Sequence, residues 1–405
     1  MGAISRVAQA RRVVEMVYFD AGGGHRSSAV ALRTVAKQQG RAWSIRMTNL
    51  RDVLEPADFI HRLTGVRAED FYNAMLKLDL TAGVRPILPL MHLLIRRMHV
   101  RNKTLLTRYF MSHPADLVVS LIPHFNRALF DGLREADAHG KNCATPMVTI
   151  MTDLADSPPH FWIERQEQFL ICGTIAAVRQ ALAMGLQSEC VFQTSGMIVR
   201  PEFYEKRDIH RADERRRLGL NPELPTGLVT FGGYGSRRML SIAERLAESG
   251  QKIQLIFVCG HNQRLRERIM ALKMPFPCLV EGFTPDIPYF MHLADFFIGK
   301  PGPATITESL VSSLPVIVAR NTSTMPQERY NTDWILQNQL GIVIRSFSEI
   351  STAVEMMIDE KQYQLFQKRI SMFNNRAVFE IPEILDRIMM MADESHIRPE
   401  IHSVA

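Results

Sequence analysis

The sequence has no hydrophobic run long enough to span a membrane. Its most apolar stretch, which begins at Ile87, is short and is interrupted by Pro89. A bilayer-spanning helix needs about 20 predominantly apolar residues, so we expect none here. The first residues lead into an apolar strand without a signal-peptide core, and Arg6 stands where a myristoylation motif needs serine or threonine. We therefore expect neither secretion nor N-terminal acylation.

Cysteine is also scarce, because the 405 residues contain only five, and no two of them form a C-x-x-C pair. Neither a disulfide framework nor a zinc cage is indicated, and a reducing cytoplasm fits this usage. The sequence also lacks an H-E-x-x-H motif, a G-x-S-x-G elbow and an Asp-x-Asp motif for holding a divalent ion against a diphosphate. We expect no metal site and no cofactor.

Positive charge prevails, with a formal net charge of +6. This excess favours anionic partners, but no recognition helix, zinc finger or aromatic single-strand motif accompanies it, so a nucleic-acid partner is disfavoured. Between Leu80 and Ala115 there is no acidic residue, and cations alternate with large apolar side chains. We predict that this segment contacts an anionic membrane surface through Arg85, Arg96, Arg97, Arg101 and Lys103. A core helix with solvated arginines is the alternative.

Two series of short β-branched runs, each alternating with helical segments, fill most of the chain. One begins at Val13 and the other at Gly227, and a polar stretch separates them. This rhythm is typical of parallel α/β sheets, and the chain is too long for a single core. The fold class we predict is α/β, with two Rossmann-like domains facing a cleft. We place them at 1–205 and 206–377.

The first series opens with a strand, three glycines and a histidine: Gly22, Gly23, Gly24 and His25. Glycines let the backbone approach a ligand at the start of the following helix, although many α/β turns need glycine for packing alone. A histidine at a strand end can take a proton from a hydroxyl, or it can simply cap the turn. Asp153, at the end of another strand, is a second candidate, although a strand-end aspartate often only caps a turn.

The second series carries a similar loop at Gly232, Gly233 and Gly235, which resembles a diphosphate cradle. The segment from Gly299 to Glu308 then runs from a strand through a proline–glycine turn into a helix. Thr305 and Glu308 match a capping box, and the functional alternative is a carboxylate that accepts two ribose hydroxyls. The donor-binding residues that we predict are Gly232, Gly233, Gly235, Lys300, Gly302, Pro303, Thr305, Glu308, Gln327, Glu328 and Asn331.

Taken together, these residues resemble the monogalactosyldiacylglycerol synthase family, relatives of the peptidoglycan glycosyltransferase MurG with the fold called GT-B. The most specific segments are DAGGGHRSSAVAL from Asp20, TDL from Thr152, VCGHNQRL from Val258, and the long run EGFTPDIPYFMHLADFFIGKPGPATITESLVSSLPVIV, in the family's order. The chain departs from the family at Ile122-Pro123-His124, where the family has His-Pro.

The resemblance implies that His25 is the base that deprotonates the acceptor hydroxyl and that Glu308 holds the donor's ribose. It also implies that Gln327, Glu328 and Asn331 bind the sugar or nucleotide, while Gly232, Gly233 and the turn at Gly302 face the diphosphate. Gly22, Gly23, Gly24 and Asp153 would lie on the acceptor side. In this fold the last helix, here about 378–405, usually packs back on the first domain.

We therefore predict an inverting glycosyltransferase of glycolipid synthesis, which moves a hexose from a UDP-sugar to the hydroxyl of diacylglycerol or a similar lipid. We expect it in the cytoplasm, attached peripherally to the inner face of the cell membrane. One alternative is a UDP-sugar epimerase on the same fold, which would not need the basic segment. Another is a catalytically silent protein that binds a nucleotide-sugar or lipid, which would tolerate the loss of His25.

Overall fold

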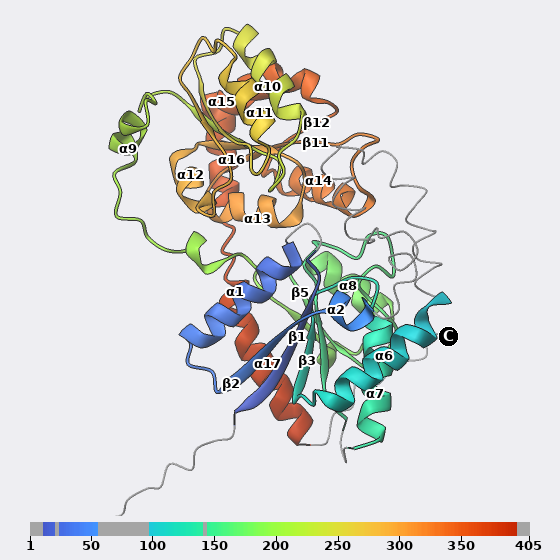
Figure 1. Ribbon diagram of the computed structural model, residues 1–405. Coiled ribbons are helices and arrows are strands. Elements are labelled where there is room, and N and C mark those ends of the chain that lie inside the picture. Colours follow the sequence, from blue (N-terminus) through green and yellow to red (C-terminus); the bar gives the residue numbers. More distant parts are fainter. Residues whose placement is uncertain (1–10, 21–23, 56–96, 141–143, 395–405) are drawn as a thin grey trace, which may run out of the picture. The chain divides into compact units, whose positions relative to one another are not determined.

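The computed structural model describes residues 11–20, 24–55, 97–140 and 144–394 (Figure 1). This part of the chain divides into two compact units. Unit 1 draws its described residues from 1–65, 91–198 and 376–405, and unit 2 spans Val199–Asn375. The boundary therefore falls a few residues before the junction that we drew after residue 205. Within the described ranges, no helix is long and apolar enough to cross a membrane.

Unit 1 is built on a six-stranded parallel sheet with the order β2-β1-β3-β4-β5-β6. Because β1 lies between β2 and β3, the chain changes direction across the sheet at the β1–β3 pair, where Val14 is opposite Leu117. The carboxyl ends of β1, β3 and β4 therefore share one edge. The strands are β1 (Arg12–Tyr18), β2 (Trp43–Asn49), β3 (Leu117–Ser120), β4 (Met147–Ile150), β5 (Phe169–Cys172) and β6 (Val191–Gln193).

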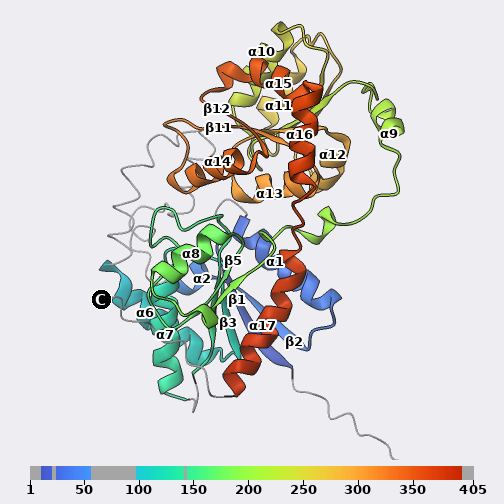
Figure 2. The same ribbon diagram turned by 180° about the vertical axis from the view of Figure 1, so that it is seen from behind.

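Helices cover both faces of this sheet (Figures 1 and 2). One face is covered by α1 (Gly24–Gln38) and α17 (Ala377–Asp393), and the other by α6 (His99–Ser112) and α7 (Asn126–Ala138). Buried side chains of α6 and α7 pack against β1 and β3 in one apolar cluster, joined by the short α2 (Leu50–Leu54). A further helix, α8 (Ile175–Ala183), packs beside β5 and β6. Apolar burial of this kind supplies most of the stability of such a unit.

The last helix, α17, is held against α1 and the start of β2 by polar contacts as well as by burial. Trp43 Nε1 donates to Asp386 Oδ1 over 2.8 Å, and Arg41 Nη1 lies 2.5 Å from the other carboxylate oxygen. Gln39 Nε2 donates to the carbonyl of Phe379 over 2.9 Å. A segment far along the chain thus completes unit 1.

Unit 2 contains a second six-stranded parallel sheet, ordered β12-β11-β10-β7-β8-β9. If its strands are numbered from β7, this sheet has the strand order of a Rossmann fold. The chain changes direction across the sheet at the β7–β10 pair, where Val229 is opposite Ile298. The strands are β7 (Thr226–Thr230), β8 (Gln254–Val258), β9 (Cys278–Glu281), β10 (Phe296–Gly299), β11 (Val316–Ala319) and β12 (Gly341–Ile344).

The helices of unit 2 again form two layers (Figures 1 and 2). The apolar sides of α10, α11 and α15 pack on one face of the sheet, and α12, α13 and α14 cover the other. The short α9 precedes the sheet, and α16 follows α15. The bounds are α9 (Arg211–Arg217), α10 (Arg238–Glu248), α11 (Gln263–Met270), α12 (Ile287–Leu293), α13 (Pro303–Val311), α14 (Pro326–Asn338), α15 (Ile350–Ile358) and α16 (Glu360–Ile370).

We predict that Asp386→Ala lowers the stability of unit 1 by about 1–2 kcal/mol, because the nearly buried indole N–H of Trp43 loses its acceptor. Asp393→Ala on the same helix is the control, since Asp393 forms an exposed ion pair with Arg12. Such pairs contribute little to stability. Calorimetric unfolding of both variants measures the difference, and equal losses would contradict the role given to Asp386.

Candidate functional site

The candidate site of unit 2 lies at the carboxyl ends of β7 and β10. Ligands of open α/β sheets bind where the strand order changes direction, because the loops on either side of that point diverge. Here the loop after β7 carries Gly232, Gly233 and Gly235, and the loop after β10 carries Lys300 and Gly302. Both loops that we predicted to bind the donor thus leave neighbouring strands at the same edge of the sheet.

The glycines after β7 are required by the close packing of backbone on backbone. Gly232 and Gly235 have φ values of +81° and +61°, which strongly favour glycine. A Cβ on Gly235 would lie 2.8 Å from the carbonyl oxygen of Cys259, and one on Gly260 would lie 2.2 Å from that of Gly233. His261 N–H also donates to Gly233 over 2.8 Å. The loop therefore rests on the loop after β8, just ahead of α10.

The segment after β10 enters α13 three residues earlier than the capping-box pattern predicts. Gly302 is the N-cap and Pro303 follows it at the first helical position, so Thr305 lies inside the first turn. The capping-box interpretation of Glu308 is therefore wrong, because proline at the first helical position sets the start of the helix. Glu308 lies further along α13, with its carboxylate 3.9 Å from Arg200 Nε. Burial raises the pKa of Glu308 to about 7, and Arg200 opposes that rise.

The first turns of α14 bring three predicted donor-binding residues next to this segment. Glu328 is buried, with Oε1 4.0 Å from Lys300 Nζ, and burial raises its pKa while Lys300 and Arg238 lower it. Asn331 Nδ2 donates to the carbonyl of Pro301 over 2.9 Å. The side-chain oxygens of Gln327 and Asn331 are buried, and among the described residues neither has a hydrogen-bond partner.

Unsatisfied buried acceptors cost about 1–3 kcal/mol each, so native proteins seldom leave them without a donor. Hydroxyl groups of a bound ligand would satisfy both amide oxygens. The N-termini of α10, α13 and α14 follow β7, β10 and β11, and such termini favour anions. The arrangement therefore suits a ligand that is both polyhydroxylated and anionic.

An aromatic cluster at the same edge was not predicted from the sequence. The ring of Phe283, which is exposed, stacks on His261 with centroids 4.0 Å apart, and Tyr234 lies 6.1 Å from His261. These residues follow β9, β8 and β7 in turn. Exposed flat rings offer a stacking surface for a planar group. The three lie far apart in the sequence, and only the order of the strands brings them together.

In unit 1, His25 lies in the first turn of α1, which follows β1. Its Nδ1 is 3.1 Å from Thr152 Oγ1, at the end of β4, and its ring lies 5.9 Å from that of Trp162. Burial lowers the pKa of His25 to about 4, and a hydrogen bond to the backbone of Leu121 opposes part of this change. The imidazole is therefore neutral at pH 7, the form that accepts a proton.

Unit 1 also contains Asp153 and His124. Asp153 accepts a hydrogen bond from Trp162 Nε1 over 2.8 Å, so its carboxylate orients the indole beside His25. His124, in the segment where the chain departs from the family, has a φ of +67° and its ring lies 4.0 Å from that of Phe161. Gly24 is the first residue of α1, whereas the predicted acceptor-side residues Gly22 and Gly23 lie outside the described residues.

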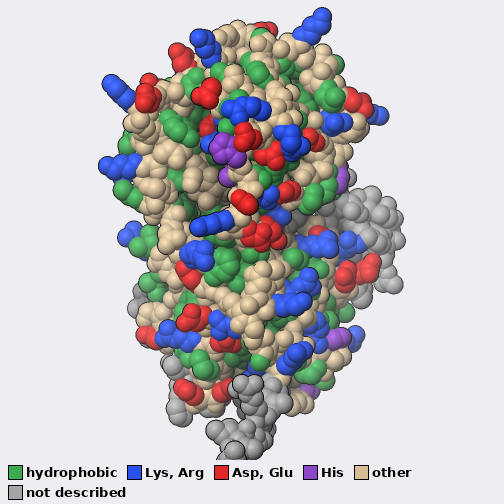
Figure 3. Space-filling view, turned by 90° about the vertical axis from the view of Figure 1, so that its left-hand side faces the viewer, with side chains coloured by type: hydrophobic (Ala, Val, Ile, Leu, Met, Phe, Trp, Pro, Cys, Tyr) green, Lys and Arg blue, Asp and Glu red, His purple; other side chains and the backbone are tan. Residues whose placement is uncertain are grey.

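Of the predicted membrane contacts, Arg85 and Arg96 lie outside the described residues. Arg97, just before α6, and Arg101, in its first turn, are exposed, as is Val100. Lys103 Nζ lies 3.2 Å from Glu135 Oε2, which neutralises part of its charge. On the face shown in Figure 3, cations and carboxylates are interspersed, so the excess positive charge does not collect there.

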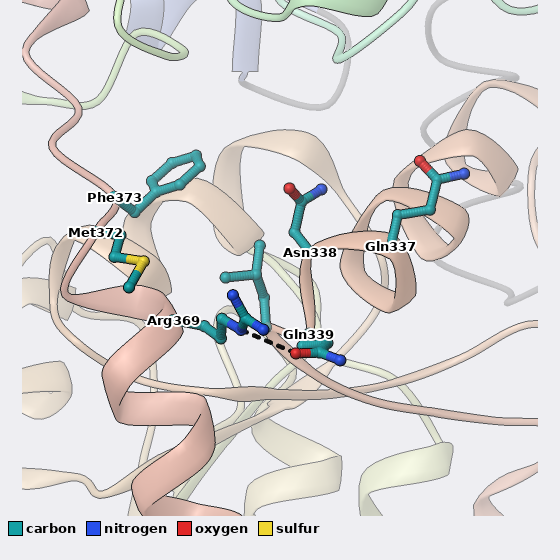
Figure 4. Close-up of a pocket in the computed structure, with 7 residues that line it drawn as sticks. Gln337, Asn338, Gln339, Arg369, Met372 and Phe373 are labelled. Atoms are coloured by element: carbon teal, nitrogen blue, oxygen red, sulfur yellow. Dashed lines mark hydrogen bonds between the residues drawn. The ribbon is translucent and has the colours of Figure 1, made fainter.

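One cavity of about 370 Å³ lies elsewhere in unit 2 (Figure 4). Gln339 at the end of α14 and Arg369 near the end of α16 line it, joined by a 2.8 Å hydrogen bond from Arg369 Nε. None of its lining residues is a predicted donor-binding residue. Within the described ranges, no cluster of His, Cys, Asp and Glu could hold a metal ion.

The class of protein follows from a comparison with known families. Residues 228–380 match the family described as the glycosyltransferase family 28 C-terminal domain. This match covers β7 to the first residues of α17, and thus every predicted donor-binding residue. The chain is a glycosyltransferase.

Individual relatives indicate a narrower class of enzyme than this family match. The chain is 26% identical to the chloroplastic monogalactosyldiacylglycerol synthase of Spinacia oleracea over 382 residues, which is 91% of this chain and 71% of the relative. It is also 26% identical to monogalactosyldiacylglycerol synthase 1 of Arabidopsis thaliana, over 89% of this chain and 68% of the relative. The resemblance predicted from the motifs is thus confirmed.

Solved structures confirm the predicted fold. MurG of Acinetobacter baumannii superposes with a TM-score of 0.57 at 13% identity, covering 93% of this chain and 99% of that one. MnaA of S. aureus, solved with UDP, gives 0.59 at 14% identity over 97% and 100% of the two chains. A putative UDP-N-acetylglucosamine 2-epimerase of Listeria monocytogenes gives 0.60 at 15% identity, with 97% and 100% covered. At these identities the likeness shows the fold alone.

We predict that Gly260→Ala destabilises unit 2 by about 3 kcal/mol or more. The alanine would have to adopt the left-handed backbone conformation, and its Cβ would clash with the carbonyl oxygen of Gly233. Gly250→Ala is the control, since Gly250 has a φ of +69° and nothing lies within 4 Å of its Cβ position. It should cost about 1–2 kcal/mol. Calorimetry compares the two variants, and a similar loss in both would show that the glycine loop does not rest on Gly260.

Proposed function

We propose that the protein is an inverting glycosyltransferase that moves a hexose from a UDP-sugar to the hydroxyl of diacylglycerol or a similar lipid. The observation that carries this proposal is the convergence of the β7, β10 and β11 loops at the switch point of unit 2. The names of the sequence relatives supply the lipid acceptor and the galactolipid product. The co-substrate is the UDP-sugar, and the scheme needs no cofactor.

On this proposal, each part of the donor has a chemically matched site in unit 2. The diphosphate lies at the helix N-termini, near Lys300 and the loop at Gly232. The ribose hydroxyls donate to Glu308, and the sugar hydroxyls satisfy the amide oxygens of Gln327 and Asn331. The exposed ring of Phe283 offers a stacking surface for the uracil.

The chemical step is a single displacement. The acceptor oxygen attacks the anomeric carbon, its proton passes to the neutral imidazole of His25, and the bond to the diphosphate breaks, so UDP leaves with the bonding electrons. A pKa near 4 makes His25 a weak base for a free alcohol. The alcohol becomes far more acidic as its new bond forms, so a late proton transfer suits this base. Helix dipoles and Lys300 stabilise the departing charge.

The epimerase alternative has less support. Epimerases are among the structural neighbours, but their likeness reaches only the fold. The sequence relatives are synthases that transfer a sugar to a lipid, according to their names. An epimerase would also need no membrane surface. The exposed cations Arg97 and Arg101 and the exposed Val100 therefore favour the transferase.

The acceptor is a lipid, so the proposal includes peripheral attachment to the inner face of the cell membrane. Arg97, just before α6, and Val100 and Arg101, in its first turn, are all exposed. A cation beside an exposed apolar side chain is typical of a helix that lies at the lipid interface. Each cation near an anionic surface increases the affinity for the membrane about fivefold.

We predict that His25→Ala lowers transfer to lipid by about 10²–10⁴-fold, the usual contribution of a general base. The assay offers radiolabelled UDP-sugars with diacylglycerol vesicles and measures label in the lipid fraction. UDP binding, measured by calorimetry, should stay unchanged, because His25 lies in unit 1. His113→Ala, which removes an exposed histidine after α6, is the control and should keep full activity. Full transfer by His25→Ala would rule out its role as base, and epimerised free UDP-sugar would favour the rival enzyme.

We also predict that Arg97→Glu with Arg101→Glu weakens binding to vesicles that contain acidic lipid by at least about twentyfold, since two cations are lost and two anions gained. Cosedimentation measures the bound fraction. The control makes the same charge change at Arg33 and Lys37, which are exposed on α1. Equal binding by the wild type to neutral and acidic vesicles would contradict the membrane contact.

A further inference from the structure

Arg200 lies at the start of unit 2, immediately before the short 3-10 helix Pro201–Phe203. Three groups fix its guanidinium. Its central carbon lies 5.1 Å from the centroid of the Phe203 ring, and Nη1 lies 3.4 Å from the carbonyl oxygen of Pro285. Its Nε is 3.9 Å from Glu308 Oε1. Arg200 therefore links α13 to the loop between β9 and α12, and no sequence motif indicated it.

Glu308 needs such a partner more than a surface carboxylate would. Its side chain is mostly buried, and burial raises its pKa to about 7. Among the described residues, Arg200 is the ionisable group whose charge opposes this rise, because Lys300 and Arg238 act on Glu328 instead. Without a nearby cation, a buried carboxyl is neutral at physiological pH.

We propose that Arg200 is a positioning residue, which holds the Glu308 carboxylate in place as an anion so that it accepts hydrogen bonds from both ribose hydroxyls of the donor. The inference rests on the proposed function, since it assumes that Glu308 binds the ribose. It adds the residue that makes the carboxylate competent to do so.

The protonation state of Glu308 matters because the ribose offers two donors. An ionised carboxylate accepts with both oxygens, whereas a protonated one uses one oxygen as a donor. Hydrogen bonds to an ionised acceptor are also about twice as strong as neutral ones. The preference for a ribose with both hydroxyls is therefore expected above pH 7 and should be lost as the pH falls through 7.

The test compares UDP with 2′-deoxy-UDP, which lacks one ribose hydroxyl. Their dissociation constants are measured by calorimetry from pH 6 to pH 9 on the full chain. The ratio of the two constants is the readout, because titration of the phosphates and of the uracil affects both ligands alike. The wild type should prefer UDP at pH 8.5 by about tenfold or more, and much less at pH 6.

Arg200→Gln removes the charge but keeps a polar side chain of similar length. The pKa of Glu308 should then rise, so the pH at which the UDP preference appears moves upward. For a rise of one in that pKa, the ionised fraction at pH 7 falls about fivefold, and the preference falls with it. At pH 9 most of the preference should return. Arg200→Lys, which keeps the charge, should stay close to the wild type.

Arg207→Gln is the matched control, because Arg207 lies in the same segment and forms an ion pair with Asp286, next to Pro285. It makes the same charge change without touching Glu308 and should leave the ratio unchanged at every pH. Glu308→Gln should abolish the pH dependence of the ratio. This second variant tests the carboxylate even where Arg200→Gln fails to fold.

Three results would overturn the inference while leaving the proposed function intact. They are an equal preference for UDP in wild type and Arg200→Gln at every pH, an equal loss of affinity for both ligands at every pH, and a wild-type preference that does not depend on pH. Failure of the wild type to bind UDP at all would instead overturn the proposed function, and this inference with it.

Discussion

The pairing of β7 with β10 is the constraint on which the proposed donor site depends. These strands are neighbours although β8 and β9 come between them in the sequence, so the loops that follow them emerge together at one edge. Gly235 and Gly260 let the β7 loop pack on the β8 loop, and Gly302 with Pro303 fixes the start of α13. The backbone thus sets the positions of the helix N-termini that we propose to bind the diphosphate, before any side chain contributes.

Electrostatics at this edge are organised as paired opposites. Glu328 Oε1 lies 4.0 Å from Lys300 Nζ, and Glu308 Oε1 lies 3.9 Å from Arg200 Nε. Each of these two carboxylates is therefore paired with a cation. In unit 1, His25 is instead neutral, because burial lowers the pKa of its imidazole to about 4. Unit 2 therefore presents paired charges at this edge, and unit 1 presents a neutral imidazole suited to accepting a proton.

The sequence predicted what depends on local pattern. The two parallel sheets, the glycine loops and the helix after Lys300 follow from strand periodicity and from glycine and proline, whose conformational preferences are strong. The start of α13 was misjudged because Thr305 and Glu308 matched a capping box, whereas Pro303 had already begun the helix. Contacts such as Arg200 with Glu308, or Phe283 with His261, join residues from separate loops, so only the fold reveals them.

The most direct test of this account is a crystal structure of the full chain with bound UDP. We expect the diphosphate at the N-termini of the helices that follow β7 and β10, with the ribose hydroxyls within hydrogen-bond distance of the Glu308 carboxylate. The amide oxygens of Gln327 and Asn331 should face the side from which the sugar extends. UDP bound anywhere else, including the cavity beside Arg369, would contradict the assignment of the donor site.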